Sequence, residues 1–196
     1  MSSELSEPLV HSLPQPSSRF ALDVLLKRMI GVAKMRGEAF LDLKQDNSRI
    51  ANLEAIGIVA LAGLSLGLGE AFAFPLGTFA MIAQVFTSIA LALLVTASWS
   101  GLMYLIGTRI FKGATDFPGL ARPIFFSLTP GLLFVLSSIA EIRQFVSPII
   151  AAWIIIINVF ALKHSMGFSS QKSMLTVTVG AWIMIFALGA LGLLST

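Results

Sequence analysis

Residues 117–194 decide the fold class, and they read FPGLARPIFFSLTPGLLFVLSSIAEIRQFVSPIIAAWIIIINVFALKHSMGFSSQKSMLTVTVGAWIMIFALGALGLL. Three apolar runs, 124–140, 145–162 and 174–194, follow one another, and none of them contains a charged residue. Each run is close to the length of about 17 to 25 residues that a helix needs to cross a bilayer. Because an unpaired peptide group is costly in hydrocarbon, these runs must be helices. The stretch therefore predicts a membrane helix bundle.

The composition of the whole chain agrees with that class. Of its 196 residues 56% are hydrophobic and 12% are charged, and the mean hydropathy is +0.89. Soluble domains carry about 25% charged residues, so an ordinary soluble domain is excluded. The length suffices for one small bundle and leaves no room for a second folded domain of useful size. The net charge of +3 follows the expected topology, and we expect no nucleic-acid partner.

Two further apolar runs, 53–68 and 79–106, precede the deciding stretch and bring the expected spans to five. Both contain small residues four apart, which let membrane helices approach closely. This spacing favours helix packing within the chain over a homodimer contact. The helix-packing candidates are Gly63, Gly67, Ser88, Ala92, Thr96 and Ser100, with Pro130 and Asn158 from the later runs.

The N-terminal part is polar. Residues 1–18 contain prolines among serines and acids, and we expect a disordered tail. Residues 19–50 show helical periodicity with a mixed apolar and charged surface. They predict a cytoplasmic amphipathic helix, which lies on the leaflet, docks a partner or packs on the bundle itself. The apolar stripe is Leu22, Leu25, Met29, Val32, Phe40 and Leu43.

The basic residues set the expected topology. With five spans in a membrane domain of residues 51–196 and a cytoplasmic N-terminus, Arg143 alone among the Lys and Arg residues lies on the far side. This distribution obeys the positive-inside rule. The C-terminus is then opposite the N-terminus. Candidates for a cytoplasmic interaction face are Lys27, Arg28, Lys34, Arg36, Arg109, Lys112 and Arg122. The expected fold is thus an all-α polytopic bundle of five transmembrane helices preceded by a cytoplasmic amphipathic helix.

Three polar or irregular positions lie inside the predicted spans. Pro130 predicts a static kink in preference to a hinge, because one proline carries no ion-binding signature. Gln84 and Asn158 are each read as interhelical hydrogen-bonding residues in preference to transport ligands, since an amide in hydrocarbon needs a partner.

No motif indicates catalysis, a metal or a cofactor, and we expect a non-enzymatic protein. The sequence lacks HExxH and paired intramembrane carboxylates. It has no cysteine and two histidines, so three nitrogen or sulfur side chains cannot meet at one metal. His11 lies in the polar tail and His164 in the joint before the last span, where we read it as an interface residue.

The deciding stretch also resembles the Yip family of small polytopic membrane proteins. The resemblance lies in five helices after a polar N-terminal region, Pro130 in the third, Trp153 early in the fourth and ALKHSMGFSSQKSMLTVTV before the fifth. Phe125 and Phe126 stand where eukaryotic members have Gly-Tyr, and DNSRIANLEAIG (46–57) stands where they have D-L-x-G-P. The chain is more similar to the shorter bacterial members. The resemblance implies a multi-pass protein and, in eukaryotic members, contacts with Rab-type GTPases in vesicle traffic.

Two functions follow as hypotheses. The first is a membrane scaffold or interaction subunit with a membrane-organising or trafficking-like role, in contact with membrane lipids and a protein partner or a second copy. It is favoured because no ionisable group lies mid-membrane, where transport of ions usually needs one. The second is a small channel or transporter with a path lined by Gln84, Pro130 and Asn158.

Overall fold

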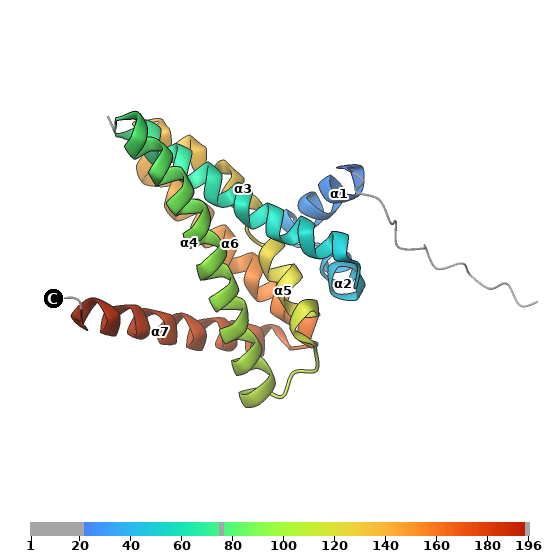
Figure 1. Ribbon diagram of the computed structural model, residues 1–196. Coiled ribbons are helices and arrows are strands. Elements are labelled where there is room, and N and C mark those ends of the chain that lie inside the picture. The colour runs from blue at the N-terminus through green and yellow to red at the C-terminus, as the bar shows by residue number, and fades with distance from the viewer. Residues whose placement is uncertain (1–21, 75–76, 195–196) are drawn as a thin grey trace, which may run out of the picture.

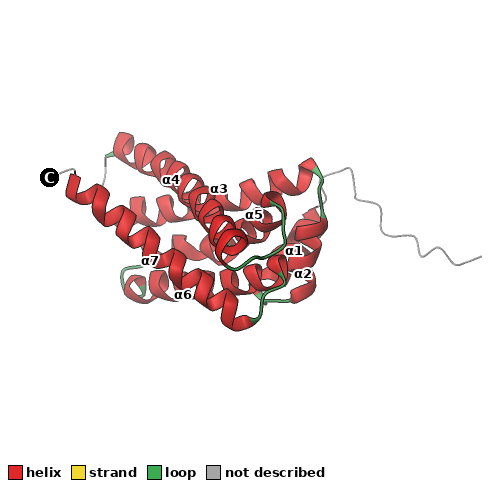
Figure 2. Cartoon of the chain, turned by 90° about the horizontal axis from the view of Figure 1, so that it is seen from below, coloured by secondary structure: helices red, strands yellow, loops and turns green. Residues whose placement is uncertain are grey.

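A computed structural model describes residues 22–74 and 77–194, and this part of the chain is helical throughout (Figures 1 and 2). The predicted disordered tail of residues 1–18 lies outside the described residues. The described helices are α1 (Leu22–Ala33), α2 (Gly37–Gln45), α3 (Arg49–Ala73), α4 (Thr78–Leu105), α5 (Phe117–Phe126), α6 (Arg143–Met166) and α7 (Ser170–Leu194). A π-helical turn, η1 (Ile106–Ile110), extends α4, and a 3-10 helix, η2 (Thr129–Ser138), follows α5.

Four segments are long and apolar enough to cross a membrane: Arg49–Ala73, Thr78–Ile110, Phe117–Ser138 and Arg143–Met166. The all-helical membrane bundle is thereby confirmed among the described residues. The fifth predicted span falls on α7, which is of similar length, lies outside this group of four and runs across α4 in Figure 1. A fifth span therefore stays a prediction, as does the place of α1 and α2 relative to a membrane.

Small residues hold α3 against α4, which lie side by side in Figure 1. A Cβ added to Gly63 would come within 2.8 Å of the Ile89 Cα and 2.9 Å of the Ala92 Cβ, and one added to Gly67 within 3.0 Å of the Ser88 Cβ. Thr96 and Ser100 are buried further along α4. The glycine pair thus serves a contact within one chain.

The third predicted span differs from a single helix kinked at Pro130. α5 begins at Phe117, earlier than the predicted residue 124, and ends at Phe126, before η2 begins. Pro130 stands in the first turn of η2, where its missing N–H costs no helical hydrogen bond. The Phe126 carbonyl is satisfied by the Thr129 hydroxyl at 2.7 Å. The proline therefore starts a new helix.

The predicted N-terminal helix is a pair of helices, α1 and α2. A turn at Lys34 to Arg36 separates them, and Met35 there has a φ of 55°, a left-handed conformation. Val32, Phe40 and Leu43 of the predicted stripe are fully buried, whereas Leu22 is exposed. The pair therefore packs on the bundle through α5 and α6.

The core of large buried side chains gathers where this pair meets the bundle. Phe40 and Leu43 of α2 belong to one cluster with Ile58 of α3, Leu120 of α5 and Leu162 of α6. In this region α2 packs against α5 and α6, and α5 in turn contacts α3.

Candidate functional site

Arg28 of α1 binds three carboxylates that come from two other helices and the joint between them. Its Nε donates to Asp42 Oδ2 at 2.8 Å, Nη2 to Asp46 Oδ2 at 2.6 Å and Nη1 to Glu54 Oε2 at 2.9 Å. Asp42 lies on α2, Asp46 follows its last residue, and Glu54 lies in the second turn of α3. One guanidinium therefore fixes the relative positions of α1, α2 and α3.

Arg28 and Asp46 stabilise each other's charged forms. Burial acts to lower the pKa of the Arg28 guanidinium, but its hydrogen bonds with Asp46, Asp42 and Glu54 outweigh burial and leave that pKa raised. Burial likewise acts to raise the pKa of the Asp46 carboxyl, yet hydrogen bonds from Ser48 and Arg28 leave it lowered. The Glu54 side chain is only 3% exposed, so removing Arg28 would leave a buried carboxylate without this partner.

Arg122 of α5 holds the other side of the same joint through backbone carbonyls. Its Nη1 donates to the Leu43 carbonyl at 2.8 Å and also to the Asp46 carbonyl, and Nη2 donates to Asn47 Oδ1 at 2.9 Å. The last carbonyls of α2 have no partner within the helix, and the guanidinium satisfies them. The residue was predicted on an interaction face but is 3% exposed, which corrects that placement.

The joint Asp46–Ser48 starts α3. Asp46 Oδ1 accepts a hydrogen bond from the Ser48 N–H at 3.0 Å, and the Ser48 hydroxyl caps α3 by accepting from the Ala51 N–H at 3.1 Å. We call Arg28, Arg122 and this joint the arginine clamp. The joint begins the segment DNSRIANLEAIG. The sequence analysis did not predict the clamp, although Ser48, four residues after Lys44, is a recognisable signal for the start of a helix.

Asn158 forms a second polar cluster, inside the bundle. Its Oδ1 accepts from Trp99 Nε1 at 3.2 Å, and its Nδ2 donates to the Ser127 hydroxyl and the Ile154 carbonyl, both at 2.9 Å. The amide thus joins α6 to α4 and to the break between α5 and η2. Each of its two polar atoms has a protein partner.

Gln84 lies far from this cluster. It is half-buried on α4, fifteen positions before Trp99, which corresponds to about 22 Å along a helix. Pro130, by contrast, is buried three residues after Ser127. The structure therefore brings Pro130 near Asn158 and leaves Gln84 apart.

A polar cleft of about 330 Å³ lies between α1 and α2. Lys27, Arg28 and Arg36 line it together with Glu38 and Asp42, over a floor that includes Gly31 and Ala39. The predicted face residues Lys34, Arg109 and Lys112 are exposed elsewhere. The cleft offers both signs of charge on two helices fixed by the clamp.

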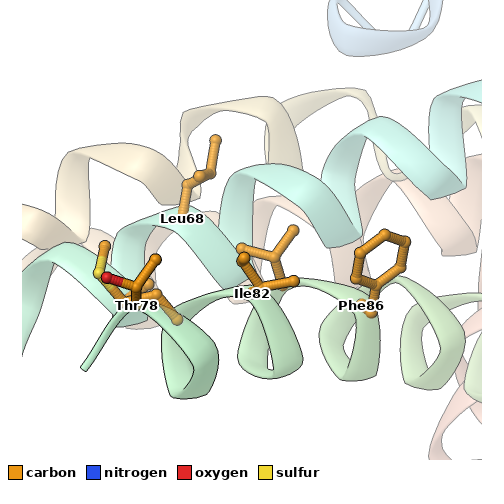
Figure 3. Close-up of a pocket in the computed structure, with 7 residues that line it drawn as sticks. Leu68, Thr78, Ile82 and Phe86 are labelled. Atoms are coloured by element: carbon orange, nitrogen blue, oxygen red, sulfur yellow. The ribbon is translucent and has the colours of Figure 1, made fainter. Parts of the chain in front are cut away.

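An apolar groove of about 300 Å³ lies between the C-terminal end of α3 and the N-terminal half of α4 (Figure 3). Figure 3 shows Leu68 on α3 and, along α4, Thr78, Ile82 and Phe86. Apart from Thr78 its lining is apolar, and Phe86 is exposed. Within the part of the chain that the structure describes, no three His, Cys, Asp or Glu residues gather to bind a metal.

Comparison with known proteins places this geometry in a family. The model of the Yip1 domain matches residues 31–193, which is most of the chain. The chain belongs to the Yip1-domain family. The match confirms the resemblance seen in the sequence, and with the four apolar helices it indicates a multi-pass membrane protein in contact with lipid. No curated protein and no solved structure matched the chain.

The Yip1 match begins at Gly31, at the end of α1, and so includes most of the arginine clamp. Asp42, Asp46, Glu54 and Arg122 lie within it, and Arg28 precedes it by three residues. The clamp therefore couples the domain to the helix in front of it.

Proposed function

We propose that this Yip1-domain protein is a non-enzymatic membrane scaffold or interaction subunit, and that the pair α1 and α2 meets its protein partner. The arginine clamp is the observation that carries the proposal. It fixes two short helices to the end of α3, a helix able to cross a membrane. A rigidly held surface loses little conformational freedom on binding, which favours recognition of a partner.

The polar cleft is the proposed contact. Its lining carries Lys27 and Arg36 beside Glu38, and Arg28 and Asp42 are bound to each other at its wall. A cleft with both signs of charge suits a protein segment that carries both signs. Such complementarity gives specificity more than raw affinity.

The proposed orientation puts α1 and α2 on the cytoplasmic side. Lys27, Lys34 and Arg36 of this pair and Arg109 and Lys112 after α4 are exposed, and the positive-inside rule assigns such residues to the cytoplasm. Arg143 begins α6 at the other end of the Phe117–Ser138 segment. With α7 as a fifth span, the C-terminus would lie opposite the N-terminus.

The alternative, a channel or transporter, has weaker support. A path lined by Gln84, Pro130 and Asn158 needs these residues near one another. Gln84 lies about 22 Å along α4 from Trp99, the residue of α4 that binds Asn158. The polar atoms of Asn158 are already bonded to Trp99, Ser127 and Ile154. We read Asn158 as a packing residue.

The test is the mass of the native complex, extracted into nanodiscs from the membranes of its own host. Deleting the N-terminal helices would remove core residues such as Phe40, so we choose the surface variant Lys27→Glu/Arg36→Glu. We expect a bound protein with the wild type and its loss with the double variant. Lys34→Glu, an exposed change outside the cleft, serves as the control and should retain the partner.

A bare monomer for all three proteins would contradict the scaffold proposal. Ion or solute flux in liposomes, abolished by Asn158→Leu, would then favour the transport alternative. Turnover of a substrate by the purified protein, lost on changing Asn158 or His164, would contradict the non-enzymatic assignment.

A further inference from the structure

A second groove, of about 260 Å³, lies on the other flank of α1, between α1 and α3. Leu25 of α1 lines it, facing Ile50, Leu53, Gly57, Ile58 and Leu61 of α3. Glu54 also borders it, but the carboxylate is buried and bound to Arg28 at 2.9 Å. The groove therefore presents an apolar lining, in contrast to the polar cleft on the opposite flank.

The exposed surface of α1 likewise has an apolar part and a charged part. Leu22, Leu26 and Ile30 are 59%, 46% and 51% exposed, and their spacing of four places them in one row. Asp23, Lys27 and Lys34 are exposed beside this row. A helix with an apolar row next to a charged row is typical of the membrane interface.

Apolar side chains are also exposed on α3. Leu53 is 67% exposed, and Ile56 and Leu61 are also exposed, on a helix able to cross a membrane. Such side chains face lipid in a membrane protein. With α3 in a membrane, the exposed Leu53 and Leu61 of the groove lining meet acyl chains.

We propose that the groove between α1 and α3 binds one acyl chain of a phospholipid from the leaflet that the N-terminal end of α3 enters. Gly57 makes the room, because a Cβ added there would meet no atom within 4 Å. Arg49 is exposed one residue before Ile50, at the headgroup end of the groove, where it can pair with the lipid phosphate. The inference requires α3 to lie in a membrane and is independent of the scaffold proposal.

The experiment uses full-length protein in phosphatidylcholine liposomes that contain phosphatidylcholine with a diazirine on one acyl chain. After photolysis, mass spectrometry locates the labelled residues. We expect label on Leu25 of the groove as well as on Ile56, which is exposed on α3 outside it. Gly57→Leu should lower the label on Leu25 at least about fivefold and leave Ile56 unchanged.

Gly101→Leu is the matched control, since an added Cβ there on α4 also meets no atom within 4 Å. It should label like the wild type. Equal labelling of Leu25 in Gly57→Leu and the wild type, or none at Leu25 in the wild type, overturns the proposal.

A second measurement covers the case in which Gly57→Leu does not fold. The chain has no cysteine, so Leu25→Cys accepts a fluorophore at one site. Brominated phosphatidylcholine should quench this label as strongly as a label at Leu53→Cys. Quenching at Leu25→Cys no greater than that of a label at Lys34→Cys would overturn the proposal.

Discussion

Three arginines of this chain each bind more than one acceptor. Arg28 binds carboxylates, Arg122 binds the carbonyls that end α2, and Arg143 binds carbonyls that end η2 and α3. Arg143 Nε donates to the Ser137 carbonyl at 2.8 Å, and its guanidinium lies 5.1 Å from the ring centroid of Phe74. The planar guanidinium with five donors is suited to such multiple bonds, so lysine is no equivalent replacement.

Replacing Arg28 tests the clamp. We expect Arg28→Met to lower the free energy of unfolding by about 3 kcal/mol, because Glu54 is left as a buried, uncompensated carboxylate. Thermal unfolding in detergent, followed by circular dichroism, measures the change. Lys27→Met alters the neighbouring exposed side chain and should shift stability by no more than about 0.5 kcal/mol. Equal effects would mean that the clamp does not stabilise the fold.

The acid sensitivity of the clamp provides a second test. The pKa of Asp46 is lowered in the folded protein, so its contribution is complete above the unfolded value of about 3.9 and is lost as pH falls through the folded value. We expect Asp46→Asn to cost about 1.5 kcal/mol at pH 7. Its melting temperature should approach that of the wild type between pH 4 and pH 3, as measured across pH 3 to 7. Parallel curves would refute this role.

The clamp could not be predicted from the sequence because its partners are distant along the chain. Arg28 lies 14 and 26 residues from Asp42 and Glu54, and Arg122 lies 79 residues from Leu43. From sequence periodicity alone, a charged residue next to a loop is predicted to be exposed to solvent. Only the turn at Met35, which reverses α2 onto α1, brings these groups together.

At the scale of elements, η2 is an unusually long 3-10 helix, since such runs rarely exceed about four residues. Ser65 of α3 supports it at two points. The Ser65 hydroxyl donates to the Leu132 carbonyl and accepts from the Val135 N–H, both at 2.8 Å. The hydrogen-bond geometry within a 3-10 helix is poor. The Ser65 side chain supplies hydrogen bonds to two backbone groups of η2.

We expect Ser65→Ala to lose about 1 to 2 kcal/mol of stability, because a buried N–H and a carbonyl lose their partner. Hydrogen exchange should then speed up at Val135 and its neighbours. Ser138→Ala is the matched change, since the Ser138 hydroxyl bonds only the Val135 carbonyl within η2. Exchange in η2 that is unaltered by Ser65→Ala would argue that packing alone sets its geometry.

The sequence predicted the apolar helices well and their irregular parts poorly. Period and length identify a span directly, and the small residues Gly63, Gly67 and Ser88 lie where α3 meets α4. The break at Ser127 depends on Asn158, which is 31 residues away. The sequence therefore identified Pro130 as an irregular position in the span, but it did not predict that Pro130 begins η2.

The depth of α1 in the membrane can be measured from two neighbouring residues. Leu26 lies in its apolar row and Lys27 in its charged row, and both are exposed. We expect a nitroxide at Leu26→Cys to be broadened more by oxygen, which concentrates in lipid, than by a water-soluble nickel chelate. The order should reverse at Lys27→Cys. Equal accessibility of both sites to the chelate would place α1 in water.

The whole molecule is built unevenly along the bundle. The fully buried Phe40, Phe126 and Leu162 lie at or toward the end that carries α1 and α2, where the arginine clamp adjoins them. The opposite end relies on Arg143 and on the close contact of Gly69 with η2, where an added Cβ would meet the Phe134 carbonyl oxygen at 2.5 Å. Stability and the proposed interaction surface thus lie together at one end.

The topology that this asymmetry implies can be tested with an impermeant maleimide on intact cells and on inverted vesicles. Because 117–138 and 143–166 are each long enough to cross, Lys112→Cys and Ser169→Cys should react from one side and Glu141→Cys from the other. The positive-inside rule assigns the first side to the cytoplasm. A tag fused after Thr196 should appear with Glu141 if α7 is a fifth span. Its appearance with Lys112 would leave four spans and make α7 a helix that lies along the membrane surface.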